Sequence, residues 1–180
     1  TRVWEKRANY PHDLFCDDVP LIQRMSRSLY LREGNYWFYD YDEDKIYIGF
    51  NPSGCELELS GLCRYGLSAK GRGVTLQDLR FENYATYDLD PVVDLGPEAV
   101  VERCTVSGSH CIGIRISSNS IIRRSAFNYN GLAGLHNGGD ETLIEYCEFG
   151  HNGWAGFSGD WARAGCKIPG VTNTVLRRNY

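Results

Sequence analysis

Short runs of alternating apolar and polar residues recur at a nearly constant interval through the second half of the chain. Ile122 and Phe127 reappear 22 residues later as Ile144 and Phe149, and the same pattern occurs five times between residue 74 and the end. One column of equivalent positions holds Leu76, Val101, Ile122, Ile144 and Leu176, a second holds Leu79, Cys104, Ser125, Cys147 and Asn179, and a third holds Phe81, Val106, Phe127 and Phe149. Polar and charged residues fall between the columns, which is the alternation of half-buried strands.

A unit of about 21–25 residues with several short strands and no helical period predicts one coil of a parallel β-helix. Each coil lies about 4.8 Å from the next, so equivalent residues stack on one another and several coils are needed to bury a core. Asn130 and Asn152 follow a strand, and we expect them to adopt the left-handed backbone of a corner. Gly113, Gly134 and Gly156 are expected where coils approach closely. The fold class is therefore all-β, a right-handed, single-stranded parallel β-helix.

The first 70 residues are less regular. Strand-like runs occupy residues 46–50, 55–60 and 65–69, while residues 17–21 and 37–45 are typical of hairpins. We interpret residues 1–180 as a single domain, with irregular N-terminal coils and an excursion in 1–70 and regular coils in 71–180. The last unit stops part-way through a coil, and we expect the natural chain to continue at both ends.

Composition narrows the function classes. The formal net charge is −4, which gives no support for nucleic-acid binding, and no apolar run is long enough to span a membrane. The seven cysteines contain no CxxC pair, which excludes a zinc ribbon. Cys104 and Cys147 share an inward column two coils apart, too far for a disulfide, so we expect them to be packing residues. Their redox state is otherwise left open.

The sequence repeats NGLAGL at 130–135 as NGWAGF at 152–157, and then diverges. We interpret the hexamers as the same corner and strand of two adjacent coils, where stacking dictates residue identity. The divergent tails are the candidates for function. In this register Arg115, His136 and Ser158 form one column, and Ser117, Gly138 and Asp160 form another.

Two stretches resemble bacterial right-handed parallel β-helix repeat proteins of the pectate-lyase-like, sugar-hydrolysis type. A DG-x-PL element of that family reads Asp17-Asp18-Val19-Pro20-Leu21 here. A GF-N-P-G-W-E-A-G-G-x-K element matches residues 156–167 at Trp161, Gly165 and Lys167, whereas its glutamate is Ala162. The resemblance implies a secreted or cell-surface protein that acts on an extracellular or cell-wall polysaccharide. Such β-helices include lyases, hydrolases, epimerases and tailspikes, so the fold does not choose the activity.

For a lyase, Arg115, His136 and Lys167 would serve as base or as cationic clamp for a uronate carboxylate. Ca²⁺ would serve the same end, held by Asp140, Glu141 and Asp160. For a hydrolase, two of these carboxylates would act as acid and base or nucleophile. Trp161, Glu141 and Ser158 are the substrate-binding candidates.

Structural roles compete with each of these assignments. His136 is also explained as a surface imidazole, Asp140-Glu141 as a turn, Trp154 as core packing and the arginine pairs 123–124 and 177–178 as a solvated face. The leading hypothesis is a polysaccharide lyase or glycoside hydrolase. The alternative is a non-catalytic glycan-binding or structural module of a surface or tailspike-type protein.

Overall fold

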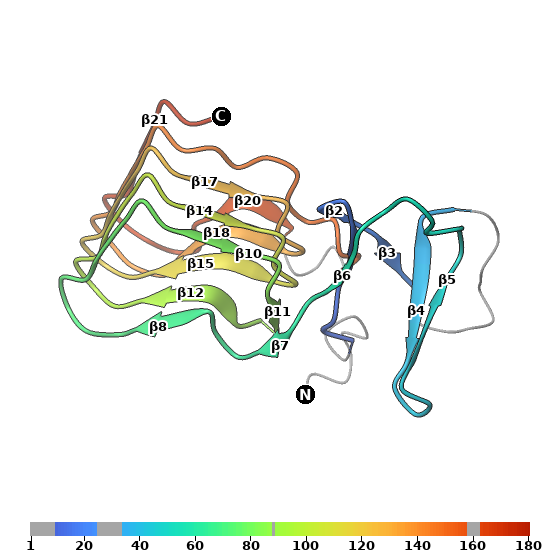
Figure 1. Cartoon of the computed structure of the whole chain (residues 1–180). Coiled ribbons are helices and arrows are strands. Elements are labelled where there is room, and N and C mark those ends of the chain that lie inside the picture. Colours follow the sequence, from blue (N-terminus) through green and yellow to red (C-terminus); the bar gives the residue numbers. More distant parts are fainter. Residues whose placement is uncertain (1–9, 25–33, 88, 158–162) are drawn as a thin grey trace.

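The chain is wound into stacked coils of short strands, with an N-terminal region on one side (Figure 1). The computed structural model describes residues 10–24, 34–87, 89–157 and 163–180, and within these residues there are strands and turns but no helix. Each regular coil passes through three parallel sheets. The predicted all-β parallel coil architecture is therefore confirmed.

Three sheets run along the axis of the coils. Sheet 1 consists of β8 (Leu67–Ala69), β12 (Pro91–Leu95), β15 (Ile112–Ile116), β18 (Ala133–Asn137) and β20 (Ala164–Lys167). Sheet 2 consists of β9 (Thr75–Gln77), β13 (Val100–Glu102), β16 (Ile121–Arg123), β19 (Leu143–Glu145) and β21 (Val175–Arg177). Sheet 3 consists of β10 (Arg80–Glu82), β14 (Thr105–Ser107) and β17 (Ala126–Asn128), and β7 (Leu62–Cys63) pairs with β11 (Ala85–Thr86).

The registers confirm the first and third stacked apolar columns, whereas Leu79 of the second column is 42% exposed. Val101 pairs with Leu76 on one side and Ile122 on the other, and Ile122 pairs in turn with Ile144. Val101, Ile122 and Ile144 are fully buried, and the Phe127 and Phe149 rings stack with centroids 5.6 Å apart. Like residues stack because each coil can bury its apolar face only against its neighbours.

Left-handed corners separate the sheets. Positive φ angles occur at Glu98, Asn119, Glu141 and Asn173 between sheets 1 and 2 (corner 1), at Asp78, Arg103, Arg124, Tyr146 and Arg178 between sheets 2 and 3 (corner 2), and at Asn83, Gly108, Tyr129 and His151 after sheet 3 (corner 3). The expectation that Asn130 and Asn152 adopt this conformation is wrong. The left-handed residues are Tyr129 and His151, one position earlier.

Asn130 and Asn152 instead point into the stack. The Asn130 amide donates to the carbonyl of Val106 at 3.1 Å, and its Oδ1 accepts from the Ser109 backbone N–H at 3.3 Å. Asn152 Oδ1 in turn accepts the Asn130 backbone N–H at 2.9 Å. A sharp corner leaves buried backbone groups without ladder partners, and an amide supplies both a donor and an acceptor to satisfy them.

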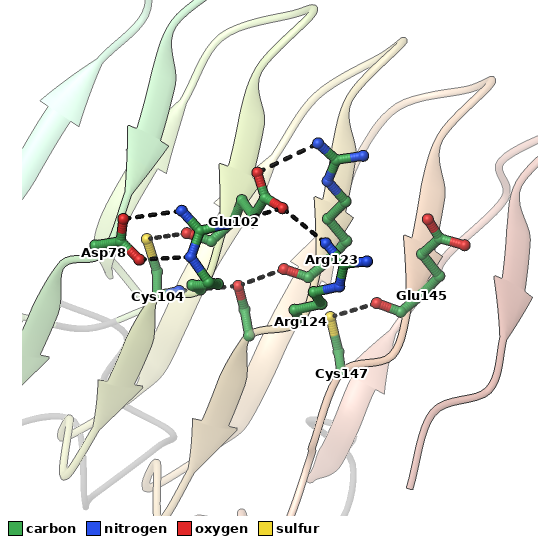
Figure 2. A network of polar contacts seen from close by, with 9 residues as sticks. Asp78, Glu102, Cys104, Arg123, Arg124, Glu145 and Cys147 are labelled. Carbon is green, nitrogen blue, oxygen red and sulfur yellow. Dashed lines mark hydrogen bonds and ion pairs between the residues drawn. The ribbon is translucent and has the colours of Figure 1, made fainter.

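The outer edge of corner 2 carries a ladder of alternating charges (Figure 2). Arg103 makes two hydrogen bonds to Asp78, at 2.7 and 2.9 Å. Glu102 accepts from Arg123 at 3.2 Å and from Arg124 at 3.1 Å. These arginines are therefore neutralised by neighbouring coils on a solvated face, in agreement with the structural interpretation of the arginine pairs.

The N-terminal region forms two small sheets beside the coils. One contains β1 (Leu14–Cys16), β2 (Val19–Pro20) and β6 (Leu57–Leu59), and the other contains β3 (Ile22–Gln23), β4 (Tyr36–Asp40) and β5 (Lys45–Ile48). The predicted hairpins are thus confirmed as the antiparallel pairs β1–β2 and β4–β5. Cys16 and Cys55 form a disulfide, with Cα atoms 5.6 Å apart. Cys104 and Cys147 are free and buried, as expected of packing residues.

A buried contact between Asp13 and His110 joins the N-terminal region to the coils. Asp13 and His110 are both fully buried, and Asp13 Oδ2 lies 3.1 Å from His110 Nδ1. Within the N-terminal region, the Ser60 hydroxyl accepts the Asp13 backbone N–H at 2.7 Å. Buried polar groups need such partners, so the Asp13–His110 contact holds the N-terminal region against the coils.

The two similar hexamers, at residues 130–135 and 152–157, do not form equivalent strands in two adjacent coils. The first copy leads into β18, whereas residues 152–157 of the second copy lie in no strand, and β20 begins only at Ala164. Ala164 pairs with Ala133, and Cys166 pairs with Leu135. The prediction that Phe157 repeats Leu135 is therefore wrong. The close approach expected at Gly156 is absent, whereas a Cβ on Gly134 would lie 2.7 Å from the Gly165 carbonyl oxygen.

Candidate functional site

A polar column crosses the outer face of sheet 1. Its register runs from Ser68 through Asp94, Arg115 and His136 to Lys167, one residue per coil. The prediction that Arg115 and His136 share a column is confirmed. The prediction that Ser158 follows His136 is wrong, because the detour between β19 and β20 places Lys167 there instead.

Asp94 is the acidic member of this column, between Ser68 and Arg115. Its side chain is only 1% exposed and lies between two cations, with Lys70 Nζ at 2.5 Å from Oδ1 and Arg115 Nη1 at 3.5 Å from Oδ2. Arg115 also donates through Nη2 to the carbonyl oxygen of Leu89 at 2.9 Å. A buried carboxylate needs such compensation. The Arg115 guanidinium is consequently held on both sides.

His136 lies between Arg115 and Lys167 in the register. Partial burial lowers the pKa of His136 below its usual 6.5, and the positive charges of Arg115 and Lys167 lower it further. Its Nδ1 is buried without a hydrogen-bond partner among the described residues. The imidazole is therefore neutral near pH 7, able to accept a proton, and flanked by two cations.

A small apolar cluster borders the column. Leu132 and Phe157 belong to a buried cluster outside the main core, and Trp154 packs against it. The Trp154 Nε1–H donates to the Tyr129 carbonyl oxygen at 2.7 Å, in agreement with the packing interpretation of this tryptophan. Between the cluster and the cations is a hollow of about 70 Å³, lined on its polar side by Arg115, His136 and Lys167. Ile112, Leu132 and Ala133 of this cluster thus form the apolar wall beside the charged column.

The remaining site candidates divide into two groups. Asp140 and Glu141 lie at corner 1, where Asp140 Oδ1 accepts the Thr172 backbone N–H at 2.7 Å and Glu141 has a φ of 56°. These contacts fit the turn interpretation, and no hydrogen bond or ion pair links them to His136 within the described chain. Ser158, Asp160 and Trp161 lie outside the described residues.

The Ca²⁺ site considered from sequence includes Asp160, which lies outside the described residues, so only Asp140 and Glu141 can be placed. Asp140 and Glu141 join no cluster of three potential ligands in the described part of the chain, and Asp140 already accepts a backbone hydrogen bond. The one such cluster found in the described ranges is Cys16, Asp17 and Cys55, whose two sulfur atoms are joined in the disulfide. We therefore assign no catalytic step to a metal.

A larger cleft, of about 450 Å³, lies over sheet 3 between Arg103, Arg124 and Tyr146. Its arginines are bonded to the corner-2 carboxylates described above. It contains no histidine with a shifted pKa. Size alone does not identify reactive chemistry, so the smaller hollow at His136 is the better candidate for proton transfer.

Sequence reasoning missed Asp94, Lys70 and Leu89. The repeat could have found Asp94, because extending the column of Arg115 and His136 by one coil toward the N-terminus leads to this residue. Lys70 and Leu89 are outside the repeated columns. Their contacts with Asp94 and Arg115 depend on side-chain direction, which the repeat does not encode.

Comparison with known protein families agrees with this architecture. Residues 52–179 match the family described as a right-handed beta helix region. The match covers most of the chain, and the chain belongs to this family. No curated protein and no solved structure matches it. In the described part of the chain there is no helix long and apolar enough to cross a bilayer.

Proposed function

We propose that this right-handed β-helix protein binds an acidic, uronate-bearing polysaccharide across sheet 1 and cleaves it by β-elimination. The observation that carries the proposal is the neutral His136 flanked by Arg115 and Lys167. Successive coils place these side chains about 4.8 Å apart, so an extended polymer can meet all three.

β-Elimination requires a base and a cation. The base removes the proton from the carbon next to the uronate carboxylate, and that electron pair forms a double bond as the glycosidic C–O bond on the adjacent carbon breaks. In our proposal His136 accepts the proton, and Arg115 and Lys167 stabilise the negative charge that develops on the carboxylate. The leaving oxygen takes a proton from solvent, so the products are an unsaturated end and a new reducing end.

Hydrolysis is less well supported. It commonly requires two carboxylates on either side of the scissile bond. In the described part of sheet 1, the carboxylate of this column is Asp94, which is buried and bonded to Lys70. An extracellular location is part of the proposal, and the Cys16–Cys55 disulfide supports it because such bonds persist in oxidising compartments.

The test is incubation with polygalacturonate, alginate and hyaluronate, and with neutral galactomannan, each with and without added Ca²⁺. β-Elimination predicts rising ultraviolet absorbance from unsaturated ends together with new reducing ends, on an acidic polymer only. Reducing ends without absorbance would replace the lyase with a hydrolase. Binding without either signal would favour the non-catalytic glycan-binding module and refute cleavage.

A further inference from the structure

The outer face of sheet 3 is lined by small side chains. The outward positions form two columns, in which Arg80 pairs with Thr105 and Thr105 with Ala126, and Glu82 pairs with Ser107 and Ser107 with Asn128. Thr105, Ser107 and Ala126 occupy the middle coils. A sheet face with short residues in its centre and longer ones at its lower end is hollowed along the axis of the coils.

Two ridges border this face. Corner 2 contributes Arg103, Arg124 and Tyr146, one per coil, on one side. Corner 3 contributes Tyr129 and His151, whose rings stack with centroids 4.6 Å apart and planes 9° from parallel. Because corner residues project outward, the flat face of sheet 3 lies between them as the floor of a trough.

The ridge at corner 3 is interrupted at Gly108. This glycine has a φ of 66°, and a Cβ there would collide with the side-chain amide of Asn83. The gap opens a hollow of about 290 Å³ lined by Gly108, Ser107 and Tyr129, with Phe15 and Pro20 of the N-terminal hairpin below. Together with the cleft of about 450 Å³ above Thr105 and Ala126, it gives two cavities over one sheet face.

The arginines of the trough are paired with carboxylates of the protein. Arg80 lies 2.5 Å from Glu82, and Arg103 is bonded to Asp78. Arg124 is bonded to Glu102 (Figure 2). A polyanion would have to displace these carboxylates from the arginines.

We propose that this trough is a second binding site, which takes a neutral polysaccharide lying along the axis of the coils. Sugar rings combine an apolar C–H face with hydroxyl groups. Tyr129 offers a ring at one wall, and Thr105, Ser107 and Glu148 offer hydrogen-bonding groups along the floor. This site is separate from the proposed β-elimination site on sheet 1, and it binds a neutral rather than an acidic polymer.

Affinity electrophoresis tests the proposal in native gels containing galactomannan, xyloglucan or hydroxyethylcellulose, with polygalacturonate as the acidic comparison. Tyr129→Asn removes the ring, and asparagine tolerates the left-handed backbone at this position. Ala126→Phe fills the floor. The matched control is Tyr87→Asn, because Tyr87 is 45% exposed and Tyr129 is 44% exposed, but Tyr87 lines neither hollow.

The proposal predicts retardation of the wild-type protein by at least one neutral polymer, with the dissociation constant raised roughly tenfold by each trough variant and unchanged by the control. Circular dichroism of each variant reports whether the fold is retained. Absence of retardation in every neutral gel, equal retardation of wild type and both folded trough variants, or retardation by polygalacturonate alone would each overturn it. None of these readouts depends on cleavage, so the proposal fails or survives independently of the sheet 1 activity.

Discussion

His136 and Lys167 are direct ladder partners on β18 and β20, although a detour of the chain separates their strands. This pairing places a second cation beside an imidazole that already adjoins Arg115. Burial and the two positive charges all lower the pKa of the histidine. The lowered pKa of His136 therefore depends in part on the pairing of β20 with β18, which brings Lys167 beside the imidazole.

Replacement of Lys167 by glutamine is expected to raise the pKa of His136, because it removes one of the charges that oppose protonation. NMR titration of the imidazole measures the change. Wild-type His136 should titrate below 6.5, and the variant should titrate at higher pH than wild type. The control is Lys45→Gln, since Lys45 lies on the N-terminal hairpin and pairs with Glu43. An equal shift in both variants would contradict the account.

The lowered pKa of His136 also predicts how the free energy of unfolding changes with pH. The folded-state pKa of His136 lies below the unfolded value near 6.5, so the unfolded chain binds more protons in that interval. The contribution of His136 to the free energy of unfolding is therefore present above about 6.5 and is lost as pH falls through the folded pKa. Urea denaturation at several pH values should show this loss, reduced in Lys167→Gln.

Gly134→Ala is expected to destabilise the protein by roughly 3 kcal/mol. Its Cβ would lie 2.6 Å from the Phe127 carbonyl oxygen and 2.7 Å from that of Gly165, and neither backbone can yield without disturbing the stack. Gly61→Ala is the control, because nothing lies within 4 Å of its added Cβ. Urea unfolding of the two variants compares them. Equal stability would mean that sheet 1 does not stack as described.

Arg124 lies at corner 2 with a φ of 50°, so we expect two substitutions there to differ in their effect on stability. Arg124→Asn and Arg124→Val both remove the ion pair with Glu102, so their difference isolates the backbone. Asparagine tolerates the left-handed region, whereas a β-branched residue does not, and the valine variant should be less stable by about 1–2 kcal/mol. Thermal or urea denaturation measures it. Variants of equal stability would exclude a left-handed corner at this position.

The inward cysteines are expected to resist alkylation. Burial raises the pKa of Cys147 to about 11 and that of Cys166 to about 12, so neither forms an appreciable thiolate near pH 8. Iodoacetamide followed by mass spectrometry should find both unmodified in the native protein and modified after unfolding in urea. Rapid labelling of the native protein would show that these columns are open to solvent.

The sequence allowed the coils to be predicted because stacking repeats the same residue types. Val101, Ile122 and Ile144 occupy one buried position in three successive coils. The corner was misplaced by one residue because Asn130 fits two roles. An asparagine tolerates a left-handed backbone, but the side-chain amide of Asn130 instead bonds buried backbone groups. Tyr129, one position earlier, adopts the left-handed conformation.

The candidate site was only half predictable for a related reason. The Arg115–His136 register follows the repeat, whereas Lys167 enters the column through a detour whose length the repeat does not specify. NGWAGF is similar in sequence to NGLAGL. In the structure, however, the segment that pairs with Ala133-Gly134-Leu135 is Ala164-Gly165-Cys166. Asp140 and Glu141 follow His136 closely in sequence but lie around a corner from it.

The most direct test of the central claim is the initial rate at which unsaturated ends form on an acidic polysaccharide, compared for wild type, His136→Ala and His12→Ala. His12 is a matched control, because burial lowers its pKa as well but it lies in the N-terminal region. Our account predicts that His136→Ala lowers the rate by about 10²-fold or more with the fold intact, whereas His12→Ala leaves it near that of wild type. An unchanged rate in folded His136→Ala would remove His136 from the site and contradict the account.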